Sequence, residues 1–208
     1  CIRDTKSDFT EPYDEHLLPL LDQTLKQTKP KRFIVLHLIG THMAYENRYP
    51  KTFKAFSTNV EQGENNKIKE TKAAYDTAVR YNDSIVNAII NRFKDKNALI
   101  IYTSDHGEDV MEINKKIAGH GDIDINNHKV EIPMLVYMSK TFQKNYPYIT
   151  NRIRLSAHHP FMTDDMIHSI LDLMEIQTKE YRPSLSIFNK QFNYKRKRIC
   201  AGKPYPIK

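Results

Sequence analysis

The sequence lacks several features that would place it in a familiar class at once. Its 208 residues contain no internal repeat, no signal-peptide pattern and no apolar run near the ~20 residues that a membrane-spanning helix needs. The two cysteines, Cys1 and Cys200, do not have the CxxC spacing of a zinc ribbon or a redox motif. They could pair with each other, pair with cysteines elsewhere, or stay free. Because the chain begins at Cys1 and not at a methionine, we expect a piece of a longer protein.

The bulk composition is that of a soluble globular domain with an excess of positive charge. Hydrophobic residues make up 39% and charged residues 27%, and 208 residues are enough for one sizeable core. The net charge of +7 is concentrated near the end of the chain, where the basic cluster 195–198 follows Lys190, Phe192 and Tyr194. Basic residues with interleaved aromatics could contact an anionic lipid surface or nucleic acid. A solvated, partly disordered tail is the plain alternative.

The hydrophobic patterns predict alternating helices and strands. Helices are expected over 11–27 and 70–93, because apolar residues recur there at helical spacing. A third helix is expected to begin after Thr163, which is a suitable N-cap. Buried strands are expected at 33–39, 98–102 and 132–138, which are short, apolar and mostly β-branched or aliphatic. Irregular structure is expected at 45–56, 59–67, 139–160 and from 183 onward. Helix, short loop and buried strand in succession indicate an α/β fold.

The run at 98–102 leads directly into a possible metal site. It is followed by Asp105, His106, Gly107 and Glu108. Carboxylate and imidazole are both suitable ligands of Zn²⁺, and the glycine lets the backbone turn sharply enough for both side chains to face one point. Glu108 could then orient His106 as an outer hydrogen-bond acceptor. The plain alternative is a capping aspartate beside a solvated histidine.

Two further histidines, His42 and His120, follow glycines on predicted loops. Ligands of open α/β sheets collect at the carboxyl ends of the strands. We therefore expect segments 40–42, 104–108 and 119–121 to meet on one edge of a sheet. One Asp and three His would then converge. That set has too few carboxylates for a calcium or magnesium cage, and it suits zinc with an anionic, phosphate-like ligand.

The other histidines carry weaker signals. His37, inside the predicted strand 33–39, is expected to be a hydrogen-bonded core residue, and His159 is a weak candidate for the site. The rest have no convergent partner in the sequence and are expected at the surface, in caps or in packing: His16, His128, His158 and His168.

In its ordered motifs the chain resembles the phosphoethanolamine transferases. The segments that carry this resemblance are FIVLHLIGTH, YENRYP, YDTAVRYNDSIV, IIYTSDHGE, GHG and IPMLVYMS, between about residues 13 and 189. These transferases are inner-membrane enzymes of Gram-negative bacteria in the alkaline phosphatase/sulfatase superfamily. The resemblance implies an α/β, alkaline phosphatase/sulfatase-like sandwich with a mixed, largely parallel sheet flanked by helices, incomplete at its N-terminal side.

The resemblance also implies roles for four residues. Asp105 and His106 would be ligands of a catalytic Zn²⁺, and His42 and His120 would contact the transferred phosphoryl group or a second zinc. Zinc would activate a threonine hydroxyl as nucleophile. Phosphatidylethanolamine would be the donor, and lipopolysaccharide, at lipid A or a core sugar, the acceptor. In this family the nucleophilic threonine and an early acidic ligand lie upstream of the matched region, and Thr41 does not occupy the nucleophile position.

We therefore expect residues 1–208 to be the C-terminal part of a periplasmic catalytic domain, with a basic irregular tail at about 184–208. Membrane helices upstream would anchor the protein in the inner membrane, and the basic excess would lie against anionic lipid. Because only about half of the metal ligands would be present, the isolated chain should be inactive and should bind zinc poorly.

Three other functions stay open at this point. A sulfatase or phosphatase of the same superfamily would have a similar metal site and would use water as acceptor. A metal-dependent mutase would be expected to show more Asp and His ligands within these residues. A non-enzymatic module could bind lipid or nucleic acid through its basic end. We expect no nucleic-acid partner, because the charge sits at one end and no recognition motif is present.

Overall fold

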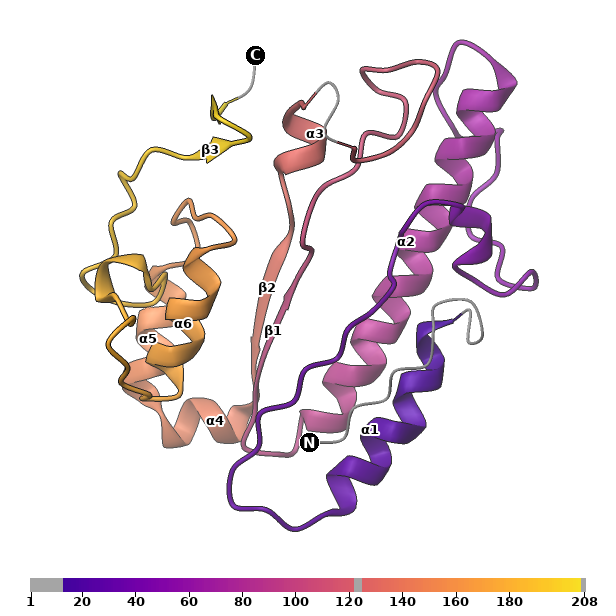
Figure 1. Cartoon of the computed structure of the whole chain (residues 1–208). Coiled ribbons are helices and arrows are strands. Elements are labelled where there is room, and N and C mark those ends of the chain that lie inside the picture. Colours follow the sequence, from indigo (N-terminus) through magenta and orange to yellow (C-terminus); the bar gives the residue numbers. More distant parts are fainter. Residues whose placement is uncertain (1–12, 122–124, 207–208) are drawn as a thin grey trace. The chain divides into compact units, whose positions relative to one another are not determined.

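The computed structural model describes residues 13–121 and 125–206, which form two compact units. Unit 1 comprises residues up to 92 together with 109–119, and unit 2 comprises 93–108 together with 120 onward. Figure 1 traces both units along the chain. No helix among the described residues is both long enough and apolar enough to cross a bilayer. Each unit has its own buried core.

Unit 1 is built on two helices, α1 (Leu17–Lys26) and α2 (Asn66–Phe93). The expected helix at 11–27 begins late, after a 3₁₀ turn at Asp14–His16, so that Pro19 falls in the first turn of α1, where a backbone N–H has no intrahelical partner. A two-point ion pair joins the helices: Arg92 Nε and Nη2 donate to Asp22 Oδ1 and Oδ2 at 2.8 and 3.1 Å. This hydrogen bond holds the pKa of Asp22 below its usual value.

The long helix α2 confirms the strongest periodic pattern of the sequence. It begins four residues before the predicted start at residue 70 and ends at the predicted residue 93. Its buried face supplies most of the unit 1 core, through Ile68, Ala73, Thr77, Ala78, Tyr81, Asn82, Ile85 and Ile89. Tyr45 packs on this face, with its ring centroid 5.2 Å from that of Tyr75.

The prediction of a buried strand at 33–39 is wrong for this chain. The segment is not assigned as a strand, and the side chains of Phe33 and Val35 are 60% and 72% exposed. His37 is also exposed, so its predicted place in the core is wrong as well. Exposed and half-buried residues alternate along the segment, as they do in a strand with one covered face. A ladder needs a neighbouring strand, and none of the described residues pairs with this segment.

Unit 2 contains the two apolar runs that were correctly predicted as strands. β1 (Leu99–Thr103) pairs with β2 (Met134–Met138) in an antiparallel register that places Leu99 opposite Met138. The other ladder among the described residues, β3 (Ile199–Cys200) with β4 (Lys203–Pro204), is also antiparallel. The parallel pairing expected for this fold class is therefore not formed within the described part of the chain.

The region 139–160, predicted to be irregular, is instead largely helical. Short helices α4 (Lys140–Asn145) and α5 (Pro147–Leu155) occupy it. Ser139 caps α4 by accepting a hydrogen bond from the N–H of Phe142 at 3.0 Å, and Pro147 starts α5 at the position where proline is tolerated. Both residues are helix-start signals, so the correct assignment was available in the sequence.

Two more helices and a buried end segment complete unit 2. α3 spans Asn127–Val130, and α6 spans Asp165–Leu173 with Asp164 as its N-cap, one residue later than the expected cap at Thr163. A 3₁₀ turn at Pro183–Leu185 leads into a buried stretch. Helices α5 and α6 lie side by side (Figure 1), and the core between them and β1–β2 is formed by Ile153, Ile187, Phe188 and Phe192.

The region expected as a basic irregular tail thus starts inside the core of unit 2. Beyond it, Arg196 donates to Asp164 at 2.6 and 2.8 Å and to the buried Asp165 at 2.9 Å, while Lys195 and Lys197 are exposed. The half-buried Cys200 forms no disulfide with any residue in the described ranges, and Cys1 lies outside them.

Candidate metal centre

Three side chains that follow β1 gather at one point in unit 2. One possible ligand atom each from His106, Glu108 and His120 lies within 4.8 Å of the others. The two imidazole rings are stacked, with centroids 3.8 Å apart and planes inclined by 26°. The structure therefore brings together His106 and His120, two of the residues singled out from the sequence, and adds a carboxylate to them.

Hydrogen bonds determine which nitrogen each ring presents. His106 Nδ1 lies 2.9 Å from the carbonyl oxygen of Gly107, and His120 Nδ1 lies 2.8 Å from Glu108 Oε2. A carbonyl and a carboxylate only accept, so Nδ1 carries the proton in both neutral rings. The lone pair then sits on Nε2, the atom that a metal or a phosphoryl oxygen can use.

The position of Glu108 differs from the expected one. Its carboxylate, on a nearly buried side chain, contacts His120 across twelve positions of the sequence. The expected acceptor role is present, with His120 in the place assigned to His106. The backbone between the two residues explains the contact: Asp109 and Gly119 exchange two backbone hydrogen bonds, of 3.3 and 2.9 Å, and directly flank Glu108 and His120.

Gly107 is required here because other backbone approaches it closely. Its N–H donates to the carbonyl of Lys129 at 2.8 Å. A Cβ on this residue would lie 2.1 Å from the carbonyl oxygen of His128 and 2.8 Å from that of Glu131. No side chain fits such a space, so the turn between His106 and Glu108 is held against α3 and its C-terminal end.

Asp105, the other predicted ligand, lies beside the cluster at the surface. Its Oδ1 accepts from the N–H of His106 at 3.1 Å and lies 3.6 Å from His106 Nε2, while its side chain is 85% exposed. Ser104 Oγ fixes the same turn by donating to the carbonyl of His106 at 2.7 Å. The Asp105–His106 separation is close to the ~3.3 Å edge of a tetrahedral zinc shell.

The donor set as a whole fits Zn²⁺. Two imidazoles and one or two carboxylates are borderline-soft to hard ligands of the kind zinc takes in catalytic sites. The ligand atoms of His106, Glu108 and His120 lie within 4.8 Å of one another, so these side chains could hold a metal ion between them.

His42 lies in unit 1, on the turn that ends segment 33–39. Its N–H donates to the carbonyl of Ile39 at 3.3 Å. The turn is held by Asp14, whose two carboxylate oxygens each accept a backbone N–H at 2.9 Å, one from Ile39 and one from Gly40. With φ at +57°, Gly40 occupies a conformation that favours glycine.

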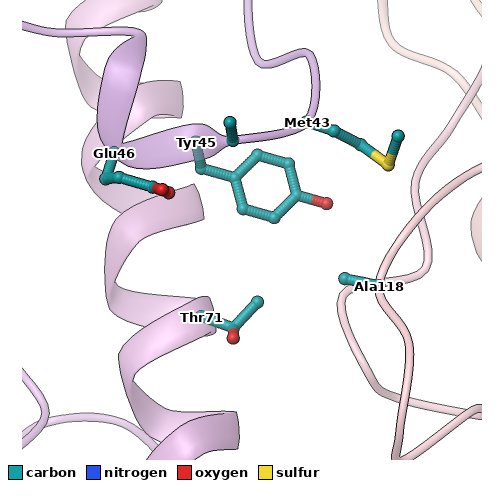
Figure 2. A pocket seen from close by; sticks show the side chains of 6 residues that line it. Met43, Tyr45, Glu46, Thr71 and Ala118 are labelled. Atoms are coloured by element: carbon teal, nitrogen blue, oxygen red, sulfur yellow. The ribbon is translucent and has the colours of Figure 1, made fainter.

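A small pocket opens directly after His42. It has a volume of about 180 Å³, and Figure 2 shows Tyr45 at its centre, with Met43 and Ala118 beyond its hydroxyl and Thr71 on α2. Ala44, at φ +60°, reverses the chain just before the 3₁₀ turn Tyr45–Asn47 and so directs Tyr45 into the core. A second pocket, of about 320 Å³, shares Glu46 and lies within the same unit.

His159, the weak candidate, belongs to an aromatic stack in unit 2. Its ring lies 5.7 Å from that of Phe192 and 5.6 Å from that of Tyr194, centroid to centroid. The structure gives it no place in the metal centre.

Comparison with known proteins identifies the family. The chain matches the sulfatase family over residues 2–176. It is 33% identical over 199 residues to the phosphoethanolamine transferase EptC of Escherichia coli O18:K1:H7, covering 93% of this chain and 34% of that protein. The chain therefore spans about a third of the length of the curated relatives it matches.

Solved structures agree with this assignment. The C-terminal periplasmic domain of EptC from Escherichia coli superposes with a TM-score of 0.79 at 31% identity, over 87% of this chain and 52% of that one. Its complex with Zn superposes with a TM-score of 0.76 at 30% identity, over 92% and 54%. The expected sulfatase-like α/β fold and the resemblance to phosphoethanolamine transferases are confirmed: the chain belongs to the sulfatase family.

Proposed function

We propose that the protein of which this chain forms part transfers phosphoethanolamine in a zinc-dependent reaction, and that this chain supplies one side of the active site. The observation that carries the proposal is the cluster of His106, Glu108 and His120, with Asp105 beside His106 just after β1. It lies in a chain whose relatives are phosphoethanolamine transferases, one of them solved in complex with Zn.

In this proposal Asp105 and His106 hold the ion. His106 binds through Nε2, because Nδ1 is bonded to the carbonyl of Gly107, and the exposed carboxylate of Asp105 lies 3.6 Å from that atom. When bound, zinc lowers the pKa of a coordinated hydroxyl and stabilises negative charge on a phosphoryl group. The remaining ligands, including the nucleophilic threonine, come from outside this chain.

His120 and His42 contact the phosphoryl group in the proposed reaction. The carboxylate of Glu108 holds the proton on Nδ1 of His120 and orients the ring, so that Nε2 faces the reacting group. His42 is presented on the turn that Asp14 fixes through the N–H groups of Ile39 and Gly40. Glu108 and Asp14 are thus positioning residues, and the histidines are the groups that touch substrate.

The proposed donor is phosphatidylethanolamine, the proposed acceptor a lipopolysaccharide, and the proposed place the periplasmic face of the inner membrane. Known structures of relatives are of periplasmic domains, which supports the location. An anionic membrane surface suits the exposed end of unit 2, where Lys195 and Lys197 stand beside the half-exposed ring of Tyr194. Neutralising these two lysines should weaken binding to phosphatidylglycerol vesicles, and unchanged vesicle affinity would remove this part of the proposal.

The test of the whole proposal uses the full-length protein, a labelled phosphatidylethanolamine donor and mass spectrometry of the product. His106→Ala should lower both zinc content and transfer, whereas His37→Ala, which removes an exposed histidine of unit 1, should preserve both. Transfer to water alone would make the protein a hydrolase of the same family. Wild-type zinc content and transfer in His106→Ala would refute the assignment of the site.

A further inference from the structure

The larger pocket of unit 1 has the composition of a site for an anionic sugar. It has a volume of about 320 Å³ and is formed by the segment that follows His42 and by one turn of α2. Binding pockets of this kind combine apolar walls with a few polar groups that fix the ligand's orientation.

Its walls are aromatic. Phe53 is held edge-on against Tyr81, with centroids 5.1 Å apart, and lies 6.5 Å from the ring of Tyr49. Phe56 lines the pocket with 44% of its surface exposed, and its backbone N–H is fixed by Thr77 Oγ1 at 3.2 Å. Flat aromatic faces that are held in place and partly open to solvent suit the apolar C–H faces of a pyranose ring.

The polar groups of the lining are of two kinds. Neutral or negative groups, from Glu46, Asn47 and Tyr49, can accept from or donate to sugar hydroxyls. The hydroxyl of Tyr49 is protonated at neutral pH and can donate, and burial raises its pKa further above the usual value of about 10. Positive groups come from Lys51 and Lys54, both exposed, and neither makes an ion pair with a carboxylate in the described ranges.

The charges of the lining favour a phosphorylated ligand over a neutral one. Two ammonium groups against the single carboxylate of Glu46 leave the pocket net positive. A phosphate dianion placed between two lysines gains charge-assisted hydrogen bonds, and the interaction weakens with salt, since both lysines are solvated. The first residue of the lining, Glu46, follows His42 by four residues on the same segment of unit 1.

We propose that this pocket binds the acceptor, as a phosphorylated sugar whose ring lies on Phe53 and Phe56 and whose phosphate is held by Lys51 and Lys54. The inference rests on the proposed transferase function and names the part of the chain that selects the acceptor. In this proposal the donor binds at another place. Substitutions in the pocket therefore weaken binding of the acceptor and leave binding of the donor unchanged.

The test measures binding by isothermal titration to the full-length protein, with glucosamine 1-phosphate, glucosamine, inorganic phosphate and phosphoethanolamine as probes. Glucosamine 1-phosphate should bind best. The double variant Lys51→Ala/Lys54→Ala should weaken it at least about tenfold and leave glucosamine binding unchanged. Phe56→Ala should weaken both sugars. Lys67→Ala, an exposed lysine on α2 outside the pocket, is the matched control and should bind all probes as the wild type does.

Several results would overturn the inference. Equal binding of inorganic phosphate would show a simple anion site, and preferred binding of phosphoethanolamine would show a donor pocket. Equal loss of affinity in Lys67→Ala would show a general charge effect. The acceptor pocket and the proposed transferase function can be tested separately. The double lysine variant should raise KM for a phosphorylated sugar acceptor, while its zinc content stays at the wild-type level. A wild-type KM in that variant would also reject the acceptor pocket.

Discussion

Segment 33–39 of unit 1 and strand β1 of unit 2 are similar apolar runs, and each leads into a loop that carries a histidine of the proposed site. β1 pairs with β2 over five residues, whereas 33–39 pairs with no strand within 13–121 and 125–206 and exposes Phe33 and Val35. The histidine loop after β1 is consequently fixed within its own unit by backbone contacts. The loop after 33–39 is held through the carboxylate of Asp14 and the hydrogen bond from the N–H of His42 to the carbonyl of Ile39. This chain thus determines the geometry around His106 more fully than that around His42.

The largest expected effect comes from filling the close approach at Gly107. Gly107→Ala would drive a Cβ to 2.1 Å from the His128 carbonyl, so we expect a loss of about 3 kcal/mol in the free energy of unfolding, together with loss of zinc from the full-length protein. Urea unfolding and metal analysis measure both. The control is Gly121→Ala, whose Cβ would meet no atom within 4 Å. Equal damage by the two substitutions would show that the turn is not the cause.

The next largest effect should come from removing a largely buried ion pair in unit 2, compared with a more exposed pair in unit 1. Asp172 lies between Arg152, Ser186 and Asn189, and Asp172→Ala removes the carboxylate partner of the largely buried Arg152 guanidinium. Because Arg152 keeps its hydrogen bond to the carbonyl of Phe188, we expect the free energy of unfolding to fall by about 2 kcal/mol. Asp22→Ala, which breaks the more exposed pair with Arg92 in unit 1, should have a much smaller effect. Similar losses in chemical denaturation would contradict this ranking.

Hydrogen exchange should then sharpen the contrast between the two histidine loops. Asp14→Ala removes the acceptor of the Ile39 and Gly40 amides, so their exchange should accelerate, while the amides of β1 keep their protection. The free energy of unfolding should fall by about 1–2 kcal/mol. Unchanged exchange at residues 39 and 40 would mean that another interaction fixes the His42 turn.

The smallest effect is a difference in pH dependence. Burial and the nearby Glu112 raise the pKa of Asp76 in unit 1, whereas the hydrogen bond from Arg196 lowers the pKa of Asp164 in unit 2. A raised carboxyl pKa means that stability is lost as pH rises through the unfolded-state pKa of about 3.9 toward the folded one. A lowered pKa means that stability is present above about pH 3.9 and is lost as pH falls through the folded pKa.

The two matching substitutions should therefore act in opposite directions. At pH 7, Asp76→Asn should stabilise the protein and Asp164→Asn should destabilise it, and both differences should shrink below pH 3 in urea unfolding. Effects of the same sign at pH 7 would show that charge is not the cause.

The sequence predicted those parts of the fold that local patterns determine. The stripe of α2 and the runs of β1 and β2 were recognisable because each buries its own face within the chain. Segment 33–39 has the same apolar pattern, but none of the residues in the described ranges pairs with it. A strand forms only when a second strand accepts and donates its backbone hydrogen bonds, and the pattern of one segment does not reveal that partner. Helices α4 and α5 were missed although Ser139 and Pro147 mark their starts.

The candidate site was predictable in its residue types and less so in its contacts. Asp105, His106 and His120 stood out because they follow a strand or lie between glycines. The contact between Glu108 and His120 was not visible, because it depends on the hydrogen bonds that close the eleven-residue loop between Asp109 and Gly119. Likewise, Gly107 was expected to permit a turn, and its actual constraint is the close approach of the backbone of α3 and of Glu131.

The central claim is that zinc is bound through His106 at the end of β1. Zinc K-edge X-ray absorption of the full-length protein tests it most directly. We predict a shell of nitrogen and oxygen at about 2.0–2.2 Å with imidazole scattering and no sulfur at about 2.3 Å. In His106→Ala the imidazole contribution and the zinc content should both fall, while His37→Ala keeps the wild-type spectrum. A sulfur shell, or an unchanged spectrum and zinc content in His106→Ala, would contradict the claim.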